Sequence, residues 1–402
     1  MKYRYKARNQ AGEPQEGVVE ASTLSSASNL LQRHNLIVVS ILPERGSGIM
    51  ATLSKFWEGV SAKEFVIFSR QLAVMIEAKV PLMTAVKGIT DQTDNPFLAK
   101  VLTEVLSDVD EGKTLSDSLR KHPNVFSELY VDMIQSGEVS GNLQKALEDL
   151  ANNIEKNYTL SQKVKGVLYY PTFILSAFFV VSFLMITFVI PKLMTIIKET
   201  NAKLPITTKM LIVSGDFMSK YWWAVLFVVI MGVGSLIYYI RTEDGQREFD
   251  VIKLRIPVVN RVLQYVYLAR FSENLSTLVK SGIPIVNALE ISARVIGNAV
   301  FEGHIMEAAE KVKRGGSIAD VLSKKRDFPP VMIQMIKVGE ETGRLDTTLV
   351  VMSNFYTREA DQIVSNLSSI IEPVLIVILG IGVGILVFSI IIPIYNVAQG
   401  IK

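Results

Sequence analysis

Residues 68–81 read FSRQLAVMIEAKVP and residues 271–284 read FSENLSTLVKSGIP, so one pattern occurs twice in the chain. The identical positions, all 203 residues apart, are Phe68, Ser69, Leu72 and Pro81 with Phe271, Ser272, Leu275 and Pro284. One residue is then lost, and GEVSGNL at 137–143 matches GEETGRL at 339–345 with an offset of 202. Agreement at a steady offset over about 130 residues indicates an internal duplication.

Each copy is predicted to form a helical bundle. Apolar residues recur at helical spacing in the first copy at Phe65, Phe68, Leu72, Met75 and Ile76. Pro81 and Pro284 then end this helix and open the next one, because a residue before proline avoids the α conformation. The second copy has Gly282 as a helix-ending glycine, and the first has Lys79 at the matching position. Short loops favour antiparallel packing of the helices.

Three uncharged or nearly uncharged segments are long enough to cross a membrane: 168–190, 222–240 and 371–395. Buried helices of soluble proteins are rarely this long and this free of charge, so membrane spans are the preferred interpretation. Two spans therefore separate the copies, and both bundles are expected on one side of the membrane. This is a parallel repeat, unlike the inverted repeats of many transporters.

Composition agrees with this mixture of parts. Of the 402 residues, 49% are hydrophobic and 20% are charged, and the mean hydropathy is +0.31. These values are too apolar for one soluble globule and too polar for a transporter made only of spans. A net charge of +3 argues against a nucleic-acid partner.

No motif for catalysis, cofactor binding or metal binding is found, so we predict a protein that is not an enzyme. The chain has no cysteine, and its three histidines lie far apart. It has no GxxxxGK[ST] phosphate loop, no HExxH and no GxSxG.

The distribution of basic residues only weakly favours one orientation of the chain in the membrane. Seven basic residues flank the first two spans on the side of the bundles, and five lysines lie in 191–221 on the other side. The first residues, MKYRYKAR, are not followed by the apolar run of a signal peptide. We therefore expect the bundles to be cytoplasmic and loop 191–221 to be external.

The N-terminal segment differs from the rest. Residues 2–8 alternate in polarity, 15–21 can return as a second strand, 24–34 can form a helix, and 36–42 a third strand. The predicted fold is thus mostly α, with three transmembrane helices, two duplicated cytoplasmic helical-bundle domains and a small N-terminal α+β domain. The predicted divisions are 1–45 (N-terminal domain), 46–60 (linker), 61–167 (first bundle), 168–190 (span), 191–221 (external loop), 222–240 (span), 241–370 (second bundle), 371–395 (span) and 396–402 (external tail).

The two GE-x-[ST]-G-x-L turns are the best surface candidates. We expect Gly137 and Gly339 to take the left-handed conformation at a helix end, and Ser140 and Thr342 to cap the next helix. Glu138 and Glu340 either place favourable charge near a helix N-terminus or contact a partner or a cation. The candidate partner-binding residues are Glu138, Ser140, Gly141, Glu340, Thr342 and Gly343.

Further candidates lie in the apolar segments. Gly380 and Gly384 form GxxxG, which allows close helix packing either within one subunit or between two copies. Glu372 is the only acid in these segments, and it serves either as an anchor or intramolecular partner or as a working site. Pro171 and Pro373 occupy matching positions near the starts of the first and third spans.

These features resemble the type II secretion F family, which includes the GspF proteins of type II secretion and the PilC-like proteins of type IV pilus assembly. The resemblance rests on GEVSGNL with GEETGRL, on YP at 170–171 with EP at 372–373, and on YRYKARNQAGEPQEG near the N-terminus. It covers the whole chain, with departures at Asn35, where many members have glycine, and at Lys79.

The resemblance implies an inner-membrane platform protein without enzymatic activity. Its expected partners are a cytoplasmic hexameric assembly or retraction ATPase, pilins or pseudopilins, other inner-membrane assembly proteins and further copies of itself. The resemblance implies no cofactor and does not separate pilus assembly from secretion. A transporter of small solutes or lipids is the alternative. The polar groups available to it within the spans are Glu372, Ser176, Ser182, Thr187, Ser235 and Ser389.

Overall fold

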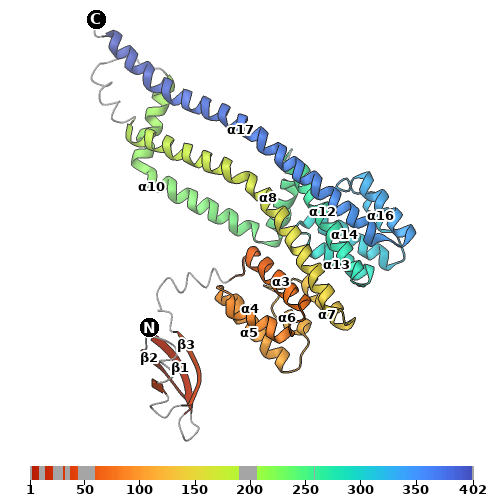
Figure 1. Cartoon of the computed structure of the whole chain (residues 1–402). Coiled ribbons are helices and arrows are strands. Elements are labelled where there is room, and N and C mark those ends of the chain that lie inside the picture. Colours follow the sequence, from red (N-terminus) through yellow and green to blue (C-terminus); the bar gives the residue numbers. More distant parts are fainter. Residues whose placement is uncertain are drawn as a thin grey trace. The chain divides into compact units, whose positions relative to one another are not determined.

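The computed structural model describes residues 2–8, 14–20, 30–31, 37–43, 59–189, 206–257 and 259–400. The chain divides into two compact units, residues 1–60 and residues 61–402 (Figure 1). The described part of the chain is mostly helical, and the strands belong to the first unit.

The first unit contains a three-stranded antiparallel sheet. Strands β1 (Lys2–Arg8), β2 (Pro14–Glu20) and β3 (Ile37–Pro43) lie in the order β2-β1-β3. The register pairs Lys2 with Glu20 on one edge of β1, and it shifts between Lys6 and Ala7 on the other. The predicted helix at 24–34 and the linker at 46–60 lie mostly outside the described residues, so the α+β domain stays a prediction.

The first helical bundle is built from short helices with well-formed starts. It comprises α3 (Ala62–Glu77), α4 (Leu82–Gln92), α5 (Pro96–Asp110), α6 (Leu115–Arg120), α7 (Glu128–Val139) and the first part of α8 (Leu143–Leu184). Ser61 and Glu64 form a capping box on α3, and the Asn95 side chain accepts from two amides of α5, each at 3.0 Å. These side chains satisfy amides that a helix start leaves without an acceptor.

Aromatic residues fill the centre of this bundle. Phe65 of α3 contacts Phe126 and Tyr130, and Phe68 contacts Phe126, with ring centroids 5.3–5.9 Å apart. Phe68, Phe126 and Tyr130 are each at most 2% exposed. Phe68 belongs to the duplicated motif, and this burial explains why the motif needs a large apolar side chain there.

The second bundle repeats the first almost element by element. Its helices are α12 (Val259–Lys280), α13 (Ile285–Val295), α14 (Ala299–Lys313), α15 (Ile318–Leu322), α16 (Pro330–Thr342) and the first part of α17 (Leu345–Gly400). Helices α13 and α14 begin 203 residues after α4 and α5, and α16 and α17 begin 202 residues after α7 and α8. The structure therefore confirms the duplication. Helix α11 (Glu243–Lys253) precedes this bundle, and its buried Asp250 accepts from the amide of Ala299 at 3.0 Å.

Three helices are long and apolar enough to cross a membrane: Leu143–Leu184, Lys220–Ile240 and Leu345–Ile385. Helix α8 is followed by a π-helical turn, η1 (Met185–Val189). Helix α10 (Ile206–Ile240) contains a break at Tyr221, so residues 206–220 of the predicted external loop are helical.

Residues 168–184 of the first predicted span continue the last helix of the first bundle without a break. Helix α8 is continuous over 42 residues and α17 over 56 residues, as Figure 1 shows. At a rise of 1.5 Å per residue, α8 is about 63 Å long, roughly twice the thickness of a bilayer core. Pro171 therefore lies inside a helix instead of at its start. Proline is tolerated inside membrane-spanning helices because neighbouring helices, hydroxyl side chains and local backbone adjustments satisfy the carbonyl that it frees.

Candidate functional site

The acidic residues of the duplicated turns hold the turns to neighbouring helices. The Glu138 carboxylate accepts from the amide of Leu115 at 2.7 Å, from the amide of Ser116 at 3.2 Å and from the Ser116 hydroxyl at 2.5 Å. These donors form the start of α6, so the carboxylate caps that short helix from α7.

The second copy repeats this arrangement. The Glu340 carboxylate accepts from the amides of Ile318 and Ala319 at 2.6 and 3.2 Å and from the Ser317 hydroxyl at 2.6 Å. Both carboxylates therefore use their two oxygens within the chain. This geometry agrees with favourable charge at a helix N-terminus, although the helices capped are α6 and α15, which precede the helices that carry the glutamates, and not the helices that follow the turns.

Two details of the turns differ from the predictions. The left-handed glycines are Gly141 and Gly343, with φ of +68° and +67°, and not Gly137 and Gly339. Gly137 serves close packing instead, since a Cβ atom there would lie 2.6 Å from the Cβ of Ala146 on α8. At Gly339 a Cβ would lie 2.5 Å from the Thr348 hydroxyl. Both glycines are needed because consecutive helices meet at the turn.

Ser140 and Thr342 do not cap the next helix. The Ser140 hydroxyl donates to the carbonyl of Ser136 at 2.7 Å, and the Thr342 hydroxyl donates to the carbonyl of Val338 at 2.6 Å. Both side chains therefore bond backward into the last turn of their own helix. Such bonds compete with capping because a hydroxyl four residues from a carbonyl can reach it directly.

The exposed surfaces of the two turns differ. In the first turn, Val139 is 85% exposed and is followed by exposed Ser140 and Gly141. In the second turn, the position of Val139 is taken by exposed Glu341, 4.0 Å from Lys337. The two copies thus share an inward glutamate but present different chemistry to solvent.

Helix α7, which leads into the first turn, also contacts the second bundle. The Ser136 hydroxyl, on α7, donates to the carbonyl of Ser281 at 2.6 Å, and Arg294 of α13 forms a two-bond ion pair with Glu128 of α7 at 2.5 and 2.8 Å. Planar two-bond pairs of this kind fix orientation as well as distance. The two bundles therefore meet in a defined geometry.

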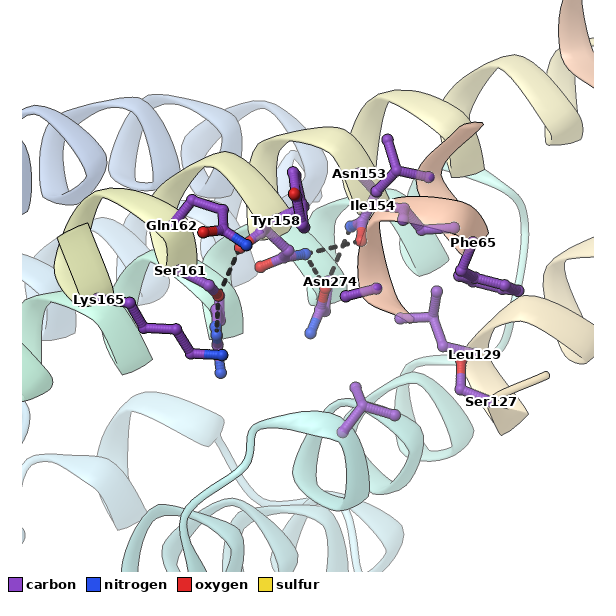
Figure 2. A pocket seen from close by; sticks show the side chains of 15 residues that line it. Phe65, Ser127, Leu129, Asn153, Ile154, Tyr158, Ser161, Gln162, Lys165 and Asn274 are labelled. Carbon is purple, nitrogen blue, oxygen red and sulfur yellow. Dashed lines mark hydrogen bonds between the residues drawn. The ribbon is translucent and has the colours of Figure 1, made fainter. Parts of the chain in front are cut away.

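A buried amide cluster lies between α8 and α12. The Asn153 amide donates to the Asn274 side-chain oxygen at 3.1 Å, and the Asn157 amide donates to the Asn153 side-chain oxygen at 2.9 Å (Figure 2). Asn153 and Asn274 are each 3% exposed. Buried amides require partners, so this cluster specifies how the two copies pack.

The membrane candidates separate into different environments. A Cβ atom at Gly382 would lie 2.6 Å from the Phe178 ring, whereas Gly380 and Gly384 have no atom of the described chain that close. Close packing between α8 and α17 therefore uses Gly382, and the GxxxG pair stays a candidate for contact with another copy. Glu372 and Pro373 are exposed, and Glu372 has no hydrogen bond or ion pair among the described residues.

The described residues contain no group of three histidine, aspartate or glutamate side chains that could hold a metal ion. Asp108 forms ion pairs with two lysines, Lys113 at 2.5 Å and Lys121 at 2.6 Å. These two lysines hold the pKa of Asp108 below its ordinary value, with the Lys113 hydrogen bond contributing most.

Comparison with known proteins decides the family. The family model described as type II secretion system (T2SS), protein F matches residues 68–191 and 271–393, and the model of its N-terminal domain matches residues 1–42. The chain belongs to the type II secretion system protein F family. The two matched segments are the two copies of the duplication, each with the span that follows it.

Relatives within this family cover the whole chain. The chain is 35% identical to the type IV pilus assembly protein PilC of Thermus thermophilus and 34% identical to that of Myxococcus xanthus, over 98% and 99% of this chain and 98% and 95% of those proteins. It is 30% identical to the type II secretion system protein F of Pseudomonas aeruginosa, over 99% of this chain and 98% of that protein. Both named systems therefore occur among similar T2SSF proteins.

Proposed function

We propose that this T2SSF protein is a non-enzymatic inner-membrane platform of a type IV pilus or type II secretion machine. In this role it couples a cytoplasmic hexameric ATPase to the assembly of pilins or pseudopilins. The observation that carries the proposal is the parallel duplication, in which each helical bundle continues directly into an apolar helix. Full-length similarity to proteins named for pilus assembly and type II secretion supports the same role.

The duplication fits a partner confined to one compartment. Two candidate spans, in α8 and α10, separate the first bundle from the second. An even number of crossings returns the chain to its starting side, so both bundles face the cytoplasm in this proposal. Polar surface on two similar domains is then available to one soluble motor.

The solvent-facing part of the turns is the proposed contact for that motor. Among the six candidate residues, Ser140, Gly141, Thr342 and Gly343 are exposed. Glu138 and Glu340 act as positioning residues, because their carboxylates already bond to helix starts. A double change of Val139→Ser with Glu341→Arg should weaken retention of the co-expressed ATPase, while the exposed change Val331→Ser should not. Equal retention by the double variant and the wild type would remove the turns from the proposal.

A clean deletion of the gene tests the function itself. Surface pili are scored by electron microscopy, and secreted proteins are profiled under conditions where both systems operate. Bald cells with a normal set of secreted proteins identify a pilus platform, and normal pili with missing secreted proteins identify a secretion platform. If neither changes, the platform proposal is wrong, and a flux assay in vesicles tests the transporter alternative.

A further inference from the structure

A cavity of about 360 Å³ lies where α3, α7, α8 and α12 meet. Its wall carries hydroxyl and amide groups, including Ser161 and Asn157 of α8 and Asn274 of α12. Figure 2 labels Ser161 and Asn274 among the side chains that line it. Two cations, Arg270 and Lys165, also line it, whereas none of the lining residues is acidic. The cavity therefore carries net positive charge without a counter-charge of its own.

The Arg270 guanidinium is mostly buried and incompletely bonded. It donates to the Ser161 hydroxyl at 2.6 Å and, more weakly, to the carbonyl of Ile296 at 3.4 Å. Its Nε is buried without a hydrogen-bond partner, and the described residues place no carboxylate within ion-pair distance of it. Burial lowers the pKa of Arg270, a sign that its charge is poorly compensated within the chain. A buried cation of this kind favours an external anion.

Acids near the cavity are already occupied. Glu128 pairs with Arg294, and Glu155 pairs with Arg70. Glu273 accepts from Lys156 at 2.9 Å and from the Ser353 hydroxyl at 2.6 Å. None of these carboxylates is therefore free to neutralise Arg270 without breaking an existing contact.

Lys165 supplies a second cation on the same wall. Its side chain is exposed and has no ion pair within the described chain. Figure 2 shows it pointing back toward Ser161, the residue that accepts from Arg270. An anion beside Ser161 is thus within reach of both a guanidinium fork and a flexible ammonium.

We propose that this cavity binds a phosphate group, carried either by the headgroup of an anionic phospholipid or by a soluble phosphate compound. Phosphate offers several acceptor oxygens for the unused donors of Arg270 and for Lys165. Lys165 lies three residues before Leu168, where the apolar segment begins, or about 5 Å along the helix. Ser161 lies about 10 Å from that point, close to the headgroup layer, which extends roughly 5–8 Å beyond the hydrocarbon. The site goes beyond the platform function and does not depend on it.

Binding to the purified full-length chain in a neutral detergent tests the proposal. Inorganic phosphate, compared with chloride at equal ionic strength, represents the soluble source. Dioctanoyl-phosphatidylglycerol, compared with dioctanoyl-phosphatidylcholine, represents the lipid source. Affinity is followed by calorimetry and by the rise in melting temperature that a ligand of the folded state causes.

Three variants locate the binding. Lys165→Gln removes an exposed charge without affecting the core and should weaken binding about fivefold to tenfold. Arg270→Gln should abolish binding, with its fold checked by circular dichroism. Lys163→Gln is the matched control, since this exposed lysine of the same helix pairs with Asp361 at 2.6 Å and does not line the cavity.

Each outcome decides the matter. Binding of phosphate alone supports a soluble ligand, and binding of phosphatidylglycerol, with or without phosphate, supports a lipid headgroup, provided that Lys165→Gln and Arg270→Gln weaken it. The proposal is overturned if neither probe binds, or if both variants bind as the wild type does. It is also overturned if Lys163→Gln weakens binding as much as Lys165→Gln, because general surface charge then explains the effect.

Discussion

Replacing Glu340 by glutamine should loosen the start of α15 without affecting the corresponding helix of the first bundle. The carboxylate accepts from the Ile318 and Ala319 amides and from the Ser317 hydroxyl. Glutamine keeps one acceptor oxygen and replaces the other with an NH₂ group. One buried amide therefore faces a donor and loses its acceptor.

The magnitude follows from these contacts. Leaving a buried donor without an acceptor costs about 1–3 kcal/mol, and the lost charge adds roughly 0.3–1 kcal/mol at a helix start. A value of about 2 kcal/mol, toward the lower end of this sum, corresponds to an opening equilibrium of the helix start about 30-fold larger. Glu341→Gln is the matched control, because this neighbouring exposed side chain makes only a 4.0 Å contact with Lys337 and should cost less than about 0.5 kcal/mol.

Hydrogen exchange of the full-length protein in detergent measures both values by mass spectrometry. Amides in 315–322 should exchange about 30-fold faster in Glu340→Gln and at most about threefold faster in Glu341→Gln. Amides in 113–120 should be unchanged in both variants. Equal exchange in the wild type and Glu340→Gln would refute the assigned role of the carboxylate, as would faster exchange spread over both bundles.

Three further predictions concern the stability of the bundles, measured by thermal unfolding of the full chain. Among the described residues, Lys79 is the non-glycine residue with a positive φ, +61°. Lys79→Gly should therefore stabilise the protein by about 0.5–1 kcal/mol, and a lower melting temperature would contradict this. Gly137→Ala should destabilise the protein by about 1–3 kcal/mol, because the added Cβ would lie 2.6 Å from the Cβ of Ala146. The control Gly303→Ala adds a Cβ in open space within a helix and should stabilise the protein by about 0.5–1 kcal/mol. Similar effects of both variants would be inconsistent with the close packing at Gly137. The Ser61 amide donates to Glu64 at 2.7 Å and does most to hold the pKa of Glu64 below its ordinary value of 4.5. This carboxylate therefore stabilises the fold above pH 4.5, and the stabilisation is lost as pH falls through the lowered pKa. Glu64→Ala should therefore lower the melting temperature at pH 7 but less at acid pH, and a pH-independent difference would argue against it.

The duplication made most of the helical architecture predictable. Proline and capping signals recur in both copies, so helix starts such as those at Leu82 and Ile285 follow from the sequence alone. The continuity of α8 and α17 could not be predicted from the sequence. A proline such as Pro171 signals a helix boundary in water but not in an apolar segment.

The turns were predicted in position but not in detail. Local spacing could not show that Glu138 reaches the start of α6, because its donors lie 22–23 residues earlier in the chain. The close approach at Gly137 was also hidden, since it depends on the crossing of two helices. Both are tertiary contacts, which single-sequence periodicity does not encode.

Differences in sequence between the two copies mark the surface where they meet. Arg270 stands where the first copy has Ile67, and Asn153 stands where the second has Phe355. A duplicated fold keeps the residues that each copy needs internally. Positions where one copy is polar and the other is apolar therefore mark surfaces that the two copies use differently.

The unbroken helices have a mechanical consequence. Helix α17 extends about 84 Å at 1.5 Å per residue, so a tilt of about 5° at one end moves the other by about 7 Å. Pro171 and Pro373 are the matching points where each rod lacks one backbone hydrogen bond, and bending is easiest there. A tilt of either bundle therefore either moves the far end of its long helix or is taken up by bending at the proline near the start of the apolar segment.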